Sequence, residues 1–435
     1  MPESTIADHR PRAELAAHAR LRSPAPSWYV PPRGATALIC GVLGLIATGA
    51  AVVADLDDGP SSGVSHALAA PDSSPGSMFA VVDQIGARDL WQAGITGAGV
   101  NVAVIDTGVA NVPALADQVV ATVDFSADAN QPTRAFVDGH GHGTHMAGIV
   151  AGRTPGADPA TSAAHPDWFM GVAPGAGIVS VKVGDSAGSV APNSLLAGID
   201  WVAQNAERLD IGVAVLAFDA SAGQSYLDDP IAAAVERAWA NDVVVVAAAG
   251  NGGPDAVGLS SPATDPYVIA VAGVDLTGDH PAIPDWASRG TDDRRPDLSA
   301  PGAHIKSLRA PGSNADVDHA SGYVDDQRFL NSGSSPAAAA IGGVAALVRS
   351  ADPTLTADQV KAKLVDGASA LGLDPAFTGA GLVDAAASVA STATGNVQDW
   401  PTSTSTILSS PLTPYSFAWM GNSWMGNSWM GNSWM

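Results

Sequence analysis

The sequence predicts an α/β fold in which helices cover both faces of a mainly parallel sheet. Within residues 78–391, short apolar runs rich in β-branched residues alternate with alanine-rich stretches of helical length. The apolar runs are 100–105, 178–183, 243–248 and 268–271, and the helical stretches are 193–206, 229–240, 336–349 and 356–366. Continuous apolar strands separated by helices are typical of a parallel sheet that is buried on both faces.

The composition supports a large core and excludes several classes of protein. The chain has 435 residues, of which 46% are hydrophobic and 14% are charged, as in a folded globular protein. Its 43 acidic residues outnumber its 20 basic ones and give a net charge of −23. Nucleic acid is therefore excluded as a partner, because binding to phosphates needs a cationic face. The single cysteine, Cys40, excludes an internal disulfide and a cysteine-based zinc site.

The N-terminal part has the pattern of an export signal. A basic leader, 1–34, precedes the uncharged apolar segment 35–54, and Asp55 begins an acidic stretch. As a helix, 20 apolar residues span about 30 Å, the thickness of a bilayer core. The charge order places the N-terminus in the cytoplasm and everything after residue 55 outside. A cleaved signal peptide and a retained anchor both remain open, so we expect a protein that is secreted or anchored at the outer face of the cytoplasmic membrane.

The segments that flank the alternating region differ from it in composition. Residues 55–77 and 392–418 are rich in polar and turn-forming residues and are interpreted as linkers. Residues 419–435 repeat Trp-Met-Gly-Asn-Ser, a period of five that gives no single apolar face on a helix or a strand. Three interpretations of this tail stay open: an aromatic ladder that contacts the cell envelope, a segment removed by proteolysis, or a tail without a specific role.

Three short segments carry residues with catalytic chemistry. Asp106 directly follows an apolar strand, where the carboxyl ends of parallel strands form a binding crevice. His142 begins a helix rich in glycine and alanine, and Ser335 precedes Pro336 at the start of another, where its hydroxyl and N–H are predicted to be exposed. Taken singly, each residue has an ordinary explanation as a cap or hydrogen-bonding group. Together, the chain order Asp, His, Ser is that of one type of catalytic triad.

A zinc site is a weaker interpretation of the histidine segment. His142 and His145 are three residues apart, whereas the helix of a zinc protease places its two histidines four apart, beside a glutamate. No glutamate is present in this segment. The spacing therefore favours a base over a pair of metal ligands.

On these motifs, residues 80–391 resemble the subtilisin-type serine peptidases, the subtilase family. The segments that match are 104–108, the His-Gly-Thr-His segment 142–145, and Gly-Ser-Ser at 333–335, where the family has Gly-Thr-Ser. Further matches are 171–176, 247–251, 295–302 and 355–360, and the tail resembles the Trp-x-Gly-x-Ser repeats of one bacterial branch. The resemblance implies a three-layer subtilisin-like fold and an exported, monomeric serine endopeptidase that acts on proteins or peptides.

The resemblance also implies a role for individual residues. Ser335 would be the nucleophile, His142 the base, and Asp106 the group that orients the imidazole, while Asn251 and the N–H of Ser335 would form the oxyanion hole. The substrate would contact a peptide-pairing edge and one wall of the specificity pocket, formed by Gly188, Ser189, Val190, Ala248, Ala249 and Gly250. Catalysis would require no cofactor; structural calcium is compatible with the family, but the sequence identifies no ligands.

Three departures from the family pattern limit these implications. Asp219 stands where the opposite pocket wall usually has glycine, which leaves the substrate preference open, and Ala339 replaces a usual proline. The linker 55–77 is too short for an independently folded inhibitory prodomain. Two other functions stay open: a catalytically silent peptide-binding module, and a surface protein whose tail carries the function after the protease domain has matured it.

Overall fold

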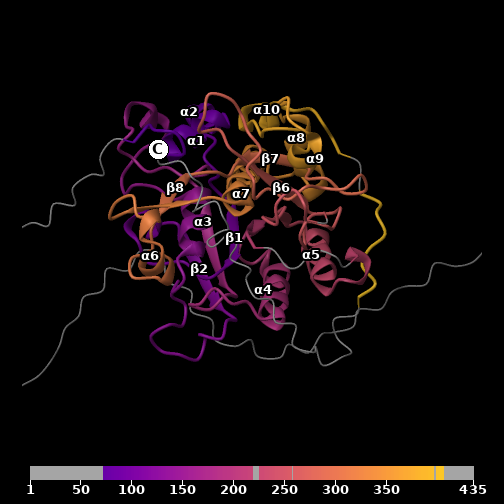
Figure 1. Cartoon of the computed structure of the whole chain (residues 1–435), viewed down its shortest axis with the longest axis horizontal. Coiled ribbons are helices and arrows are strands. Elements are labelled where there is room, and N and C mark those ends of the chain that lie inside the picture. The colour runs from indigo at the N-terminus through magenta and orange to yellow at the C-terminus, as the bar shows by residue number, and fades with distance from the viewer. Residues whose placement is uncertain (1–71, 219–224, 257, 396–397, 406–435) are drawn as a thin grey trace, which may run out of the picture.

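The computed structural model describes residues 72–218, 225–256, 258–395 and 398–405, and their centre is a seven-stranded sheet (Figure 1). Its strand order is β2-β3-β1-β4-β5-β6-β7, and every neighbouring pair is parallel. The strands are β1 Asn101–Asp106, β2 Val119–Asp124, β3 Gly177–Lys182, β4 Ile211–Leu216, β5 Val244–Ala248, β6 Ile269–Val274 and β7 Leu298–Pro301. The predicted α/β class is confirmed; β2, β4 and β7 lie outside the four apolar runs used to predict it.

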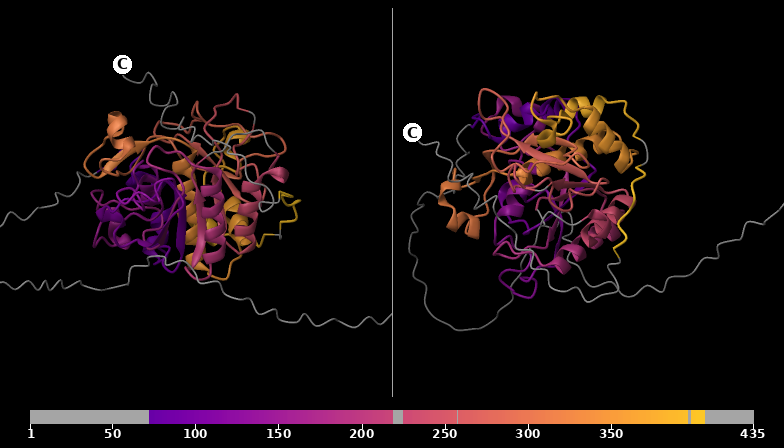
Figure 2. Two further views of the ribbon diagram at one scale, coloured as in Figure 1. Left: turned by 90° about the horizontal axis from the view of Figure 1, so that it is seen from below. Right: turned by 45° about the vertical axis from the view of Figure 1, so that its right-hand side comes forward.

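Helices lie on both sides of this sheet (Figure 2). They are α1 Met78–Gln84, α2 Ala87–Gln92, α3 His142–Ala151, α4 Pro192–Asn205, α5 Pro230–Ala240, α6 Asn314–Asp318, α7 Ser334–Ala351, α8 Ala357–Asp366, α9 Pro375–Thr378 and α10 Ala385–Ala390. Val104 pairs with Val215, which contacts α7, whereas the next residue, Ile105, contacts α4. Since side chains alternate along a strand, α7 and α4 cover opposite faces, and Asp106 points to the α7 face.

The central helix α7 packs closely against the sheet because its inner side carries glycine. A Cβ atom on Gly342 would lie 2.3 Å from Val215 Cγ2, and one on Gly343 would lie 2.6 Å from Val172 Cβ. The helix is buried from Ser334 to Arg349, and Pro336 occupies its first turn, where a missing N–H costs little. This packing fixes the start of α7, and thus Ser335, against the sheet.

A hairpin delivers the chain to α7. Strands β8 Ile305–Leu308 and β9 Arg328–Asn331 are antiparallel, and the connection between them carries α6. His145 of α3 contacts the carbonyl oxygens of Ile305 and Phe329 through Nε2, at 3.3 and 3.1 Å. Burial lowers the pKa of His145 to about 3, so this imidazole stays neutral and joins α3 to the hairpin.

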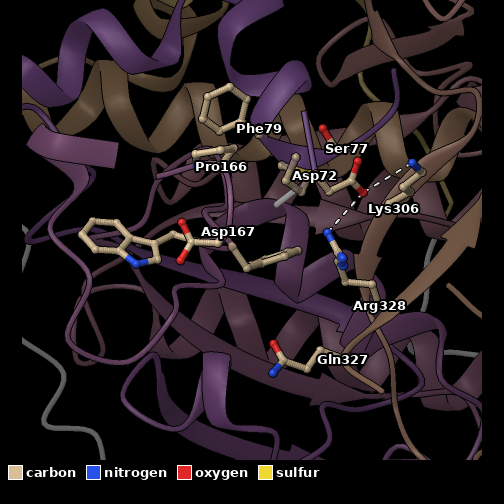
Figure 3. A pocket seen from close by; sticks show the side chains of 11 residues that line it. Asp72, Ser77, Phe79, Pro166, Asp167, Lys306, Gln327 and Arg328 are labelled. Atoms are coloured by element: carbon tan, nitrogen blue, oxygen red, sulfur yellow. Dashed lines mark hydrogen bonds and ion pairs between the residues drawn. The ribbon is translucent and has the colours of Figure 1, made fainter. Parts of the chain in front are cut away.

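The segment before α1 is fastened to this hairpin (Figure 3). The Asp72 carboxylate pairs with Lys306 Nζ at 3.4 Å and with Arg328 Nη1 at 3.1 Å. The amide of Asp72 donates to Pro166 O, and Ser77 forms a bridge with Lys306. Residues 72–77, predicted to be linker, are thus bound to the domain.

The segment after α10 is also bound to the domain in its described part. Both Glu236 carboxylate oxygens accept from Ser403 N, at 2.8 and 3.1 Å, and Thr404 N donates to Leu227 O. The hydroxyl of Tyr267 donates to Trp400 O. Residues 398–405 therefore form a strap over α5, although the sequence suggested a flexible linker from residue 392.

The remaining sequence predictions lie outside the described residues. They concern the leader 1–34, the apolar segment 35–54, the repeat tail 419–435 and Asp219. Within the ranges that are described, no helix has the length and apolar character that a membrane span requires.

Candidate active site

The predicted site residues meet at one edge of the sheet. Asp106, at the end of β1, is level with Lys182 at the end of β3, and its neighbour Ile105 is level with Leu216 near the end of β4. Leu216 in turn is level with Ala247 in β5. Because all these strands are parallel, the segments that follow them emerge side by side, and the starts of α3 and α7 complete the same edge.

Asp106 and His142 form a buried pair. Both side chains are fully buried, and His142 Nδ1 lies 2.9 Å from each oxygen of the Asp106 carboxylate. The carboxylate also accepts from Thr107 N at 2.7 Å. The carboxylate therefore holds the proton on Nδ1 and leaves Nε2 as the basic nitrogen of the imidazole.

Asp138 supports this pair, and the sequence analysis did not identify it. Its carboxylate is buried and accepts from the Thr107 hydroxyl at 2.9 Å, from Gly141 N at 2.7 Å and from Thr144 N at 2.8 Å. These bonds join the end of β1 to the first turn of α3. Asp138 thus fixes Asp106 and His142 relative to each other by holding the residues next to them in the chain.

Lys182 is a second supporting residue that sequence reasoning missed. Its ammonium group is buried, donates to Thr107 O at 3.0 Å and to Val137 O at 2.9 Å, and pairs with Asp128 at 3.3 Å. The available signal was a lone lysine at the end of an otherwise apolar strand, since a buried lysine requires partners.

Ser335 is placed at the site in a different orientation from the one predicted. The residue is only 3% exposed, so the prediction of an exposed hydroxyl is wrong. Its Oγ donates to Ala217 O, 2.6 Å away, in the residue that directly follows β4. The strand order explains this contact, because β4 lies between the strand of Asp106 and the strand that leads to Asn251.

Ser334, which was also missed as a site residue, orients the amide of Asn251. Asn251 Oδ1 accepts from Ser334 N at 2.8 Å and from Ser334 Oγ at 3.1 Å. The same hydroxyl accepts from Gly250 N at 3.1 Å. Two bonds to Oδ1 determine which end of the amide faces Ser334, so the NH2 group is at the opposite end.

The two predicted substrate-contacting segments lie at the carboxyl ends of β3 and β5, the strands on either side of β1 and β4. Gly188, Ser189 and Val190 follow β3 in a turn that is closed by a bridge between Gly184 and Val190. Gly188 has φ +78°, and a Cβ atom there would lie 2.7 Å from His140 Nε2, so only glycine fits. Ala248, Ala249 and Gly250 are buried at the end of β5.

The environment of His140 differs from that of a titrating base. Burial, together with the neighbouring His142, lowers the pKa of His140 to about 4. The two rings lie 6.4 Å apart between centroids. His140 is therefore neutral above pH 5 and packs closely against Gly188.

The described residues contain no group of three or more His, Cys, Asp or Glu side chains that is arranged to hold a metal ion. No calcium ligand set can be assigned among them, and no step of the chemistry below uses a metal.

A parallel α/β sheet with an acid, an imidazole and a serine hydroxyl at its carboxyl edge defines a class of serine peptidases. Residues 97–404 match the family model described as the Subtilase family, Peptidase_S8. This match covers well over half of the chain, which therefore belongs to the subtilase family and is a serine-type endopeptidase with a subtilisin-like fold.

Several proteins of known class are similar to the chain. Serine protease AprX of Bacillus subtilis (strain 168) is 36% identical over 308 residues, which are 68% of this chain and 67% of that protein. A thermostable alkaline protease of Halalkalibacterium halodurans is 32% identical over 301 residues, 69% of this chain and 70% of that one. The crystal structure of fervidolysin from Fervidobacterium pennivorans, a keratinolytic enzyme related to subtilisin, aligns with a TM-score of 0.57 at 27% identity. That alignment covers 72% of this chain and 45% of fervidolysin, so the chain spans less than half of that longer protein.

Proposed function

We propose that the chain is an exported serine endopeptidase that hydrolyses peptide bonds through Asp106, His142 and Ser335, with Asn251 in the oxyanion hole. The observation that supports this most directly is the buried contact of 2.9 Å between His142 Nδ1 and both Asp106 oxygens, at the edge that also carries Ser335. Family membership gives the reaction class, and the contacts of these residues support the roles proposed for them.

Acylation begins when Ser335 Oγ attacks the carbonyl carbon of the substrate. The hydroxyl proton, which Ala217 O accepts in this structure, is redirected to His142 Nε2 as the C–O bond forms. Asp106 stays ionised and stabilises the imidazolium ion. His142 then gives the proton to the leaving amine as the C–N bond breaks. Water repeats the sequence to release the acid product and restore Ser335.

Charge develops on the substrate oxygen during both steps. The amide NH2 of Asn251 and the N–H of Ser335 are the proposed donors to this oxyanion. The two hydrogen bonds from Ser334 to Asn251 Oδ1 hold the amide in the required orientation before substrate arrives. A donor fixed in advance needs no reorganisation during the reaction, which is why it favours the transition state.

Substrate binding is assigned to the segments that flank the triad. The turn with Gly188, Ser189 and Val190 would pair with an extended peptide through its backbone, and Ala248, Ala249 and Gly250 would line one wall of the first pocket. Burial of these alanines gives a smooth, uncharged wall. The preference of the enzyme for the substrate residue before the scissile bond would also depend on the segment with Asp219. Asp219 is outside the described residues.

Export and attachment are proposed from the sequence alone. The basic leader and apolar segment 35–54 direct the catalytic domain out of the cytoplasm, either as a signal peptide or as an anchor. The tryptophans of the tail would provide contact with the cell envelope.

Replacing the nucleophile tests this function. Ser335→Ala removes one oxygen at the start of α7, so folding should be retained while hydrolysis of casein falls by several orders of magnitude. A fluorophosphonate probe should label the wild-type chain at Ser335 and leave the variant unlabelled. Casein hydrolysis at the wild-type rate by Ser335→Ala would refute the mechanism, and a wild-type chain that neither reacts with the probe nor cleaves casein would be a silent binding module.

A further inference from the structure

The connection between β8 and β9, residues 309–327, carries the short helix α6, which is bonded to the residues just before His142. The base of this connection is held firmly. The Arg309 guanidinium binds both carboxylate oxygens of Asp316 and lies 4.9 Å from the ring centroid of Tyr323. The hydrogen bond from Arg309 lowers the pKa of Asp316, which favours the ionised form of this carboxyl. The start of α6 is therefore a fixed point on the rim of the site.

The first residues of α6 are bonded to the loop that carries His142. Asn314 N donates to Gly139 O at 2.9 Å, and Ala315 N donates to His140 O at 3.0 Å. Gly141, the residue before His142, has φ +104°, and a Cβ atom on it would lie 2.6 Å from Ser313 Oγ. The backbone of α6 thus fits closely against this loop, which we call the histidine loop (138–141).

The side chain of Asn314 reaches the turn that follows β3. Its Nδ2 donates to Ser186 O at 2.7 Å. Ser186 belongs to the turn 185–189, the edge turn, which leads into the proposed peptide-pairing edge. Ser186 is also held by Asp128. The Oδ2 atom of Asp128 accepts hydrogen bonds from Ser186 N at 2.8 Å and from Ser186 Oγ at 2.7 Å. Asn314 therefore supplies a second restraint, on the side of the turn that faces the histidine loop.

We propose that Asn314 is a positioning residue that sets the distance between the base His142 and the peptide-pairing edge. Its backbone is hydrogen-bonded to the histidine loop and its side-chain amide to the edge turn, so one residue is bonded to both segments. The proposal rests on the proposed function, because it takes His142 as the base and Gly188, Ser189 and Val190 as the edge. Asn314 itself lies outside the reacting group and acts through these two segments.

The consequence depends on the length of the substrate. An extended peptide must contact the peptide-pairing edge and present its scissile bond to Ser335 at the same time. Its binding therefore depends on the spacing between the histidine loop and the edge turn. A small acyl ester reacts with Ser335 and His142 without reaching the edge. Loss of the Asn314 amide donor should therefore weaken the binding of a peptide and have little effect on the ester.

The test uses the full-length chain with Asn314→Asp, which keeps the shape of the side chain but removes both donor hydrogens. An acidic residue at the first position of a helix is favourable, so this variant should fold as well as the wild type. Asn314→Gln, which restores an NH2 group on a longer side chain, is the conservative variant. Val317→Ala is the matched control, because Val317 is on the same helix and is 68% exposed.

Steady-state kinetics are measured with a tetrapeptide p-nitroanilide and with p-nitrophenyl acetate. For Asn314→Asp we expect a rise in KM for the tetrapeptide of about 3- to 10-fold, the effect of one net hydrogen bond, with kcat and ester hydrolysis changed less than 2-fold. Asn314→Gln should recover part of the loss, and Val317→Ala should match the wild type on both substrates.

Three results would overturn the proposal: no change in the tetrapeptide KM, an equal loss on both substrates, or a loss confined to kcat. Ser335→Ala is run in parallel to separate this proposal from the mechanism. If that variant keeps both activities, the assignment of the nucleophile fails; if it loses both while Asn314→Asp behaves as the wild type, only the role of Asn314 fails.

Discussion

Asp265 should make the domain less stable as the pH rises, and Asp265→Asn should remove this dependence. Asp265, in the connection that leads from β5 to β6, is fully buried, and burial raises its pKa to about 7, with a further contribution from the nearby Glu236 carboxylate. Arg294 and Lys361 act in the opposite direction without cancelling the effect of burial. One carboxylate oxygen, Oδ1, accepts from Tyr267 N at 2.8 Å, a bond that the oxygen of an asparagine can keep.

The magnitude follows from the two protonation states. In the unfolded chain the carboxyl loses its proton near pH 3.8, and in the folded domain near pH 7, so the folded state binds more protons between these values. Stability from this group is therefore fully present below about pH 4 and is lost as the pH rises through 7. The full loss is on the order of 4 kcal/mol, of which about 3 kcal/mol falls between pH 5 and pH 9.

The assay is urea unfolding at pH 5, 7 and 9, with Ser335→Ala as the background to prevent self-digestion. Both chains share the buried His140 and His145, whose lowered pKa values weaken the fold in acid, so the comparison cancels that contribution. Relative to the parent, Asp265→Asn should gain about 3 kcal/mol in unfolding free energy from pH 5 to pH 9. Asp117→Asn, at an exposed position, is the control and should show no such gain. A difference between Asp265→Asn and its parent that is the same at all three pH values would refute the reasoning.

Two further predictions concern catalysis and the tail. Asn251→Ala should lower kcat on a peptide about 10²–10³-fold with little change in KM, because the donor acts on charge that appears only in the transition state; an effect confined to KM in steady-state assays would instead make Asn251 a substrate contact. Deletion of residues 419–435 should leave hydrolysis of a short peptide unchanged and reduce retention on isolated cell envelopes in a pull-down, whereas equal retention of both forms would remove the envelope-binding role.

The sequence predicted the parts of this protein that local chemistry determines. An apolar strand that ends in Asp106, a glycine-rich helix that begins at His142 and a proline just after Ser335 are each visible within about ten residues. The parallel topology then requires that such strand ends meet at one edge, so the α/β class and the assembly of the candidate site followed from the same pattern.

The supporting residues could not be predicted in this way, because their partners are distant in the chain. Asp138 is one of many aspartates in an acidic sequence, and only the fold brings it to Thr107, 31 positions away. From the sequence, Ser334 is predicted only to be part of a helix start. Its role becomes visible in the fold, where it is hydrogen-bonded to Asn251, 83 positions away. The predicted exposure of the Ser335 hydroxyl was wrong for the same reason, since its acceptor, Ala217 O, is 118 positions away, directly after β4.

The connection 309–327 shows how a segment without a sequence signal can still shape a site. Its glycine, proline and aspartate residues are those of an ordinary surface loop, and Asn314 in isolation would be assigned to a turn or a cap. The antiparallel register of β8 and β9 fixes where this loop starts and ends, and the Arg309–Asp316 pair fixes how it folds back. Only then does the amide of Asn314 reach Ser186 while its backbone meets the histidine loop. The spacing between base and substrate edge is therefore a property of three segments together, and substitutions at Arg309 should act on peptide binding through the same route as those at Asn314.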